Sequence, residues 1–132
     1  MRKIGILFVI LLQSCLFGVG LVEQEITDKY WLTANNTLDE MSIWYFPGEH
    51  QSELIVEQTV FEVGHNDDYI IAKSHPNDSV NGLNKNVTYY HLIEVARASK
   101  SIPLTLEQFE SKKKELQVSE KLEFTTVFEV LK

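Results

Sequence analysis

The sequence contains a single cysteine, Cys15, so no disulfide can form within the chain. It also lacks a Gly-x-Ser-x-Gly motif and a glycine-rich phosphate loop. These absences remove the strongest sequence evidence for nucleophilic catalysis and for nucleotide binding. We therefore assign no catalytic residue, expect no cofactor, and keep an enzymatic function only as an alternative.

Basic residues are also scarce, with 12 Lys and Arg against 19 Asp and Glu and a formal net charge of −7. An acidic surface repels a phosphate backbone, and no Lys/Arg stripe alternates with aromatic residues, so we expect no nucleic-acid partner. The 132 residues suit one domain, and their 44% hydrophobic content is enough for a core without disulfides.

The N-terminus has the pattern of an export signal. Arg2 and Lys3 precede an almost unbroken apolar run over 4–12, which is typical of a secretory signal peptide. The run ends in Leu-Gln-Ser-Cys at 12–15, which resembles a bacterial lipobox, a signal in which cleavage precedes the cysteine and its thiol is acylated. We therefore predict a lipoprotein signal peptide at 1-14 and a lipid anchor on Cys15. This predicts an extracytoplasmic protein of the cell envelope, attached to a membrane.

Two other readings of the N-terminus stay open. The segment 4–22 has 19 residues and is nearly long enough to remain as an uncleaved transmembrane anchor. Alternatively, Gly18-Val19-Gly20 is a small-x-small cleavage site that would release the protein.

The remaining chain divides into a lipidated cysteine with a tether at 15-29 and a single α+β domain at 30-132. Period-two patterns and turn residues predict strands over 30–34, 41–46, 54–63, 69–74 and 87–96. The third strand has a bulge at 57–59, and a polar loop covers 75–86.

The C-terminal part has a helical pattern. Thr105 and Gln108 have capping-box spacing just after Pro103, and Leu106, Phe109 and Leu116 lie on one predicted helical face. A final strand follows over 122–130. The fold class is therefore α+β, an antiparallel β-meander of about five strands, one α-helix packed on the sheet, then a final strand.

Several segments resemble a known family. They are Val63–Lys73 with His75-Pro76 soon after, Val87-Thr88-Tyr89-Tyr90, and Pro103–Phe109 followed by Lys-rich residues. Together they resemble the domain-of-unknown-function family 3997 of small bacterial envelope lipoproteins. The resemblance covers roughly 60–124. Ile102 departs from the glycine that members have before this proline. The family has no established activity, so the resemblance implies fold and location and assigns no functional residue.

Aromatic side chains are the best candidates for a binding site. Five of them cluster in predicted strands, where one face builds the core and the other can contact a partner: Trp31, Trp44, Tyr45, Tyr89 and Tyr90. We choose Trp44, Tyr89 and Tyr90 as the candidate contacts. Histidines offer less: His65 and His75 lie at opposite ends of a predicted strand, and no local metal-ligand spacing occurs, so we predict no metal site. The pair Asp67-Asp68 is typical of a tight turn.

The leading hypothesis is a non-enzymatic, membrane-anchored lipoprotein that binds or accompanies an envelope protein, peptide or glycan. One alternative is a small extracytoplasmic hydrolase using His91, His75 and a nearby acid, which requires a histidine and a carboxylate within hydrogen-bond reach. Another is an immunity-like inhibitor whose acidic surface suits a basic secreted toxin.

Overall fold

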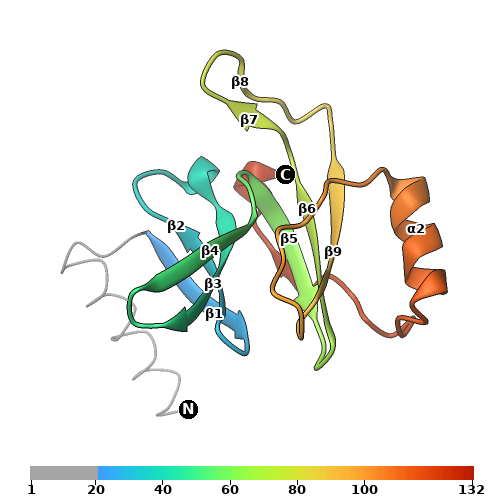
Figure 1. Cartoon of the computed structure of the whole chain (residues 1–132). Coiled ribbons are helices and arrows are strands. Elements are labelled where there is room, and N and C mark those ends of the chain that lie inside the picture. Colours follow the sequence, from blue (N-terminus) through green and yellow to red (C-terminus); the bar gives the residue numbers. More distant parts are fainter. Residues whose placement is uncertain (1–20) are drawn as a thin grey trace, which may run out of the picture.

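The computed structural model describes residues 21–132, whose longer strands form two four-stranded antiparallel sheets (Figure 1). The N-terminal sheet has its strands in chain order: β1 (Val22–Thr27), β2 (Tyr30–Ala34), β3 (Ser42–Gly48) and β4 (Gln51–Val56). The central sheet has the order β10 (Thr126–Val127), β5 (Val60–His65), β6 (Tyr69–Ser74) and β9 (Tyr89–Glu94). The described residues also contain one α-helix, α2 (Leu106–Glu115).

Four short elements complete the described part of the chain. They are the hairpin strands β7 (Asn77–Asp78) and β8 (Gly82–Leu83), and the 3₁₀ turns η1 (Leu38–Glu40) and η2 (Glu129–Leu131). None of the helices formed by residues 21–132 has the length and apolar character needed to cross a membrane.

The elements form three layers, with the central sheet between the N-terminal sheet and α2 (Figure 1). Side chains alternate along β6, so Ile70 and Ala72 pack towards the N-terminal sheet while Ile71 packs with Phe109 of α2. A sheet covered on both faces requires apolar side chains on both. This is why β6 is nearly continuous in apolar residues.

The N-terminal sheet is buried on one face only. Tyr30 and Leu32 of β2 belong to the core between the sheets, whereas the alternate residues Trp31 and Thr33 are half-buried on the outward face. This alternation follows from the period of two along a strand. It leaves one whole face of the N-terminal sheet available for another use.

Helix α2 begins as the sequence predicts. The Thr105 hydroxyl accepts a hydrogen bond from the Gln108 backbone N–H at 3.1 Å, and the Gln108 side chain accepts one from the Thr105 backbone N–H at 3.0 Å. The capping box is thus confirmed. Phe109 is buried and Leu116 packs beside it, but Leu106 is 52% exposed, so its predicted place on the docking face is wrong.

The prediction of an antiparallel α+β meander with a helix packed on a sheet is confirmed, but the meander has more than five strands and is divided between sheets. The segment 54–63 does not form one bulged strand, because β4 ends at Val56 and β5 begins at Val60 in the other sheet. Thr59 between them is fully buried, and its backbone forms two 2.9 Å hydrogen bonds with the backbone of His75. This backbone pairing fixes the chain at the point where it passes from the N-terminal sheet to the central sheet.

The ends of the domain also differ from expectation. Residues 22–27, predicted within the tether, form β1 and pair with β2, so the domain begins before Tyr30. β1 is a polar edge strand with little burial, so its sequence lacks the apolar alternation of a strand. The predicted last strand shortens to β10, which ends before η2. The predicted signal peptide and Cys15 lie outside the described residues.

Candidate functional site

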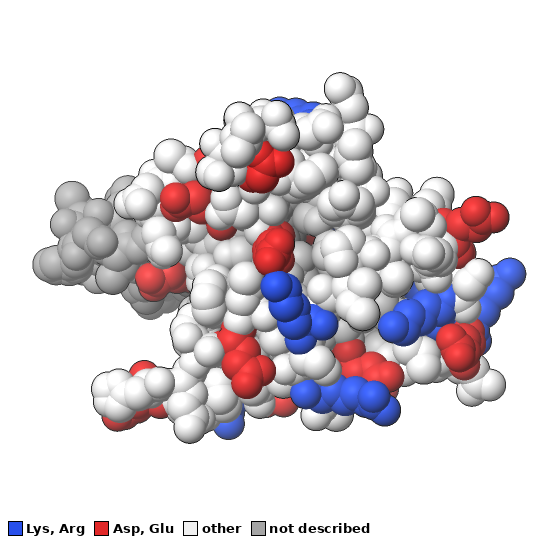
Figure 2. Space-filling model, turned by 45° about the horizontal axis from the view of Figure 1, so that its top comes forward, with Lys and Arg blue, Asp and Glu red and all other residues white. Residues whose placement is uncertain are grey.

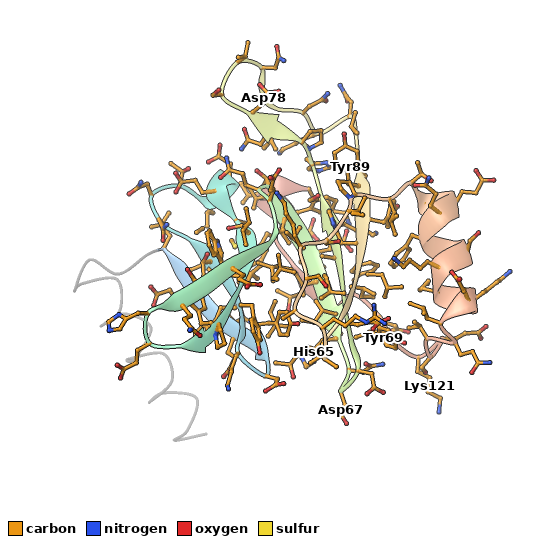
Figure 3. All side chains as sticks on the ribbon, viewed as in Figure 1. His65, Asp67, Tyr69, Asp78, Tyr89 and Lys121 are labelled. Carbon is orange, nitrogen blue, oxygen red and sulfur yellow. The ribbon has the colours of Figure 1, made fainter. Side chains whose placement is uncertain are left out.

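The three predicted contact residues lie in different places. Trp44 is on β3 in the N-terminal sheet, while Tyr89 and Tyr90 are neighbours on β9 in the central sheet. Adjacent strand residues point to opposite faces, and Tyr90 packs under α2 with its ring 5.3 Å from that of Phe109. Tyr89 lies near the base of the β7–β8 hairpin (Figure 3). The structure therefore brings neither tyrosine to Trp44.

Trp44 belongs instead to an aromatic cluster on the outward face of the N-terminal sheet. Trp31 of β2 is its direct cross-strand partner, and Phe46 lies two residues further along β3 on the same face. The Trp44 and Phe46 rings are nearly parallel, with 6.4 Å between centroids and 23° between planes. We call Trp31, Trp44 and Phe46 the aromatic face.

An open hollow of about 520 Å³ lies against the aromatic face. Polar side chains complete its lining, and the polar members are Glu23, Thr33, Asn35 and Ser52. The described residues that line it include one acid and no Lys or Arg. Apolar rings with a few polar groups around them are the usual composition of a ligand site.

The indole of Trp44 is held in place from one side. Its Nε1–H donates a hydrogen bond to the Ser42 hydroxyl at 3.0 Å. The ring orientation is thus set before any ligand arrives, which lowers the entropy cost of binding. Phe46 is 37% exposed, so a ligand can reach its ring.

A second hollow of about 340 Å³ lies beside β9 and contains a buried histidine. His91 is 3% exposed, and its two ring nitrogens contact the hydroxyls of Ser74 at 2.8 Å and Ser101 at 2.9 Å. Burial lowers the pKa of His91 to about 4. The imidazole is therefore neutral near pH 7, with one nitrogen donating and the other accepting.

His75 lines the same hollow and is also buried. Its ring stacks on Phe61 with 4.1 Å between centroids, and its Nδ1–H donates to the Val87 carbonyl oxygen at 2.7 Å. Its Nε2 is buried without a hydrogen-bond partner among residues 21–132. These contacts make His75 a packing residue between β6 and the loop before β9.

Glu57 and Asp78 line the histidine hollow, but neither His75 nor His91 forms a hydrogen bond with a carboxylate there. Ser74 and His91 have the spacing of a nucleophile and its base, but the other nitrogen of His91 meets a serine and not a carboxylate. No histidine in the described part of the chain forms a hydrogen bond or an ion pair with an acid. A base with a pKa of about 4 also accepts a proton poorly at neutral pH.

The other candidates from the sequence lie at the turn between β5 and β6. His65 and Asp67 lie near one end of the central sheet (Figure 3), and His75 follows the opposite end of β6. The Asn66 side chain accepts hydrogen bonds from the backbone N–H groups of Asp68 and Tyr69, which confirms the predicted turn. Within residues 21–132, no three His, Cys, Asp or Glu side chains are grouped so as to hold a metal ion.

Phe46 is the member of the aromatic face that we did not single out from the sequence, and Trp31 was noted among the strand aromatics but not chosen as a contact. The period of two along the strand from Trp44 to Phe46 already indicates a shared face. Trp31 needs the register between β2 and β3, which a single sequence does not provide.

The fold and the aromatic face define a class of protein, a small α+β domain with two four-stranded antiparallel sheets. Helix α2 packs on the central sheet, and the aromatic face lies on the N-terminal sheet. The family described as "Protein of unknown function (DUF3997)" matches residues 24–128, and the chain belongs to it. No curated protein and no solved structure matched the chain.

Proposed function

We propose that this protein is a lipid-anchored, non-enzymatic protein of the cell envelope that binds a partner there through the aromatic face. Acylated Cys15 is the anchor in this proposal. The binding role is supported by one observation: both tryptophans of the chain are direct partners on an open, outward surface. Large aromatic residues gathered at an accessible place are typical of interaction sites.

The hydrophobic core between the sheets does not include the rings of the aromatic face. The core between the sheets is built from the opposite side of the same strands, where Tyr30, Leu32 and Ile43 are buried. A solvated sheet face is ordinarily occupied by polar residues. Two indoles and a phenyl ring on that face therefore support a binding role.

The anchor and the aromatic face are close in sequence. Glu23, which lines the hollow, is eight positions after Cys15. Fully extended, eight residues span about 27 Å, at roughly 3.4 Å each. In a protein acylated at Cys15, the aromatic face stays within a few nanometres of the membrane surface. Its partner is therefore an envelope component.

The charge distribution supports a partner other than nucleic acid. The chain carries a net charge of −7, and basic and acidic side chains are interspersed on the described surface that Figure 2 shows. Nucleic-acid binding requires a continuous basic patch.

Sedimentation with isolated cell envelopes tests the binding role. To exclude pelleting through the lipid anchor, residues 16–132, which contain the whole described fold but neither the leader nor Cys15, are mixed with washed envelopes, and the fraction that pellets is compared between the wild-type sequence and the double variant Trp31→Ala/Trp44→Ala. We expect the double variant to lose at least 80% of the pelleted fraction, because the contact rings are removed.

Two further variants give the experiment its controls. Tyr89→Ala removes an exposed ring from the central sheet and should pellet like wild type. Trp31→Phe/Trp44→Phe keeps apolar rings and should retain part of the binding. Equal pelleting of wild type and the double alanine variant, with the fold intact by circular dichroism, would show that the aromatic face is not the binding site.

A further inference from the structure

The hollow over the aromatic face restricts the chemistry of its ligand. The lining combines three aromatic rings with hydroxyl and amide side chains and a single carboxylate, Glu23. A ligand that fits must present apolar patches to the rings and hydrogen-bonding groups to the polar side chains. It must do so without strong negative charge.

From this composition we infer that the aromatic face binds an uncharged saccharide chain. This inference rests on the proposed function and names the ligand class of the same site. A pyranose ring has C–H bonds on its faces and hydroxyls around its edge. The C–H groups carry a small positive charge, which suits the negative face of an indole or phenyl ring. The hydroxyls reach the polar residues beside it, namely Thr33, Asn35 and Ser52.

The arrangement of the rings suits a chain of sugars more than a single one. Trp44 and Phe46 are spaced 6.4 Å apart along β3, and Trp31 lies beside Trp44 on β2. Several rings in a row can contact successive sugar units of one polymer. Each unit adds a weak contact, so the affinity rises with the number of units.

Charge complementarity disfavours anionic polymers and anionic lipids. The hollow has Glu23 and no basic side chain among its described lining residues, and the whole chain is acidic. A phosphate-bearing polymer or lipid headgroup would meet repulsion on approach. An uncharged sugar chain meets none.

A peptide bound by strand addition would use a different part of the sheet. Strand addition needs unpaired backbone groups at a sheet edge. Trp31 and Trp44 lie on β2 and β3, which each have a paired strand on both sides. A ligand on the aromatic face therefore contacts side chains and not free backbone groups.

The protein's own fluorescence measures this binding directly. Trp31 and Trp44 are its only two tryptophans, so all indole emission comes from the aromatic face. The full-length protein is reconstituted in phosphatidylcholine vesicles and titrated with the β-1,4-linked hexamers of glucose and of N-acetylglucosamine. We expect a saturable emission shift with at least one hexamer, and at least tenfold weaker binding for the corresponding disaccharide.

Variants and a second probe separate the possible outcomes. Trp44→Ala should weaken hexamer binding at least tenfold by calorimetry, Trp44→Phe should weaken it less, and Tyr89→Ala should leave it unchanged. Vesicles of brominated phosphatidylcholine report whether the indoles enter the bilayer, because bromine quenches them there. Strong quenching would overturn the saccharide assignment in favour of a membrane contact.

The two proposals fail in different ways. Tryptophan-dependent pelleting with envelopes, without binding of either hexamer, would overturn the saccharide ligand and leave the binding role in place. Envelope pelleting that is independent of Trp31 and Trp44 would overturn both.

Discussion

The hydroxyl of Tyr30 donates a hydrogen bond to the carbonyl oxygen of Val95 at 2.8 Å, between residues 65 positions apart in the chain. Tyr30 lies on β2 of the N-terminal sheet, and Val95 directly follows β9 of the central sheet. The bond therefore joins the two sheets through their shared core. Burial raises the pKa of Tyr30 to about 12, so the phenol keeps its proton and donates throughout the neutral range.

Replacing Tyr30 by phenylalanine should weaken the contact between the sheets. The substitution leaves the ring in place but removes the hydrogen bond to the Val95 carbonyl. We expect the free energy of unfolding to fall by about 1–3 kcal/mol, the cost of an unsatisfied buried group. Urea denaturation measures this change. Tyr45→Phe is the control, because the Tyr45 ring packs on Tyr30 with a 4.7 Å centroid distance and its hydroxyl has no partner in the described residues. Equal stability of the two variants would contradict this role.

Gly64 should be intolerant of any side chain. A methyl group there would overlap the backbone carbonyl oxygen of Glu123, where the chain crosses β5. We expect Gly64→Ala to lower the free energy of unfolding by at least about 2 kcal/mol, because backbone must move to make room. Gly48→Ala is the matched control, since its new methyl would contact only the Gln51 side chain at 3.5 Å. Thermal unfolding of both variants checks the prediction, and similar midpoints would refute it.

Stability should fall in mild acid because of His91. Its folded-state pKa of about 4 lies below the ordinary value of 6.5, so the unfolded chain binds a proton first. The resulting loss of unfolding free energy is absent above about pH 6.5, grows as the pH falls, and is complete below about pH 4. The shift corresponds to roughly 3 kcal/mol at 1.36 kcal/mol per unit.

A non-titrating variant isolates this contribution from that of the carboxylates. His91→Gln should show a shallower loss of unfolding free energy between pH 6.5 and 4 than wild type. His50→Gln, which changes an exposed histidine, should keep the wild-type slope. If the His91 and His50 variants have the same pH dependence, His91 does not titrate as stated.

The lipid anchor makes a separate prediction. Cys15 is the only thiol of the chain, and Cys15→Ser removes the acceptor of the acyl group. We expect the wild type to incorporate a clickable fatty acid in cells and the serine variant to incorporate none. Mass spectrometry of the native N-terminus identifies the first residue. An unmodified protein that begins at Met1 would contradict the anchor.

Local elements of this fold could be predicted from the sequence. The bounds of β2 and β6 match their predicted ranges, and the Thr105–Gln108 capping box begins α2. Each of these elements is specified by neighbouring residues. Alternation along a strand and the spacing of a cap are visible within a few positions.

The assembly of the strands could not be predicted in the same way. The segment 54–63 is apolar on both sides of its crossing, because Val56 and Val60 both enter the core between the sheets. The pattern does not show that the chain changes sheets there. The crossing depends on backbone pairing between Thr59 and His75, which are 16 positions apart.

The candidate site was predicted in part. Trp44 was chosen from the sequence as a candidate contact, and the period of two along the strand already places Phe46 on the same face. Tyr90 was proposed as a contact, but α2 covers it. Alternation shows that Tyr89 and Tyr90 face opposite sides, and it does not show which side a later helix will cover.

The measurement closest to the central claim is acrylamide quenching, in the presence of isolated envelopes, of protein that carries 5-hydroxytryptophan at both tryptophan positions and is excited where the tryptophans of envelope proteins do not absorb. Acrylamide reaches indoles only where solvent does, and both indoles belong to the aromatic face. Full-length protein bound to envelopes should be quenched at least twofold less than the same protein in phosphatidylcholine vesicles. Quenching that stays the same when the protein is bound would mean that the partner, whatever it is, does not cover Trp31 and Trp44.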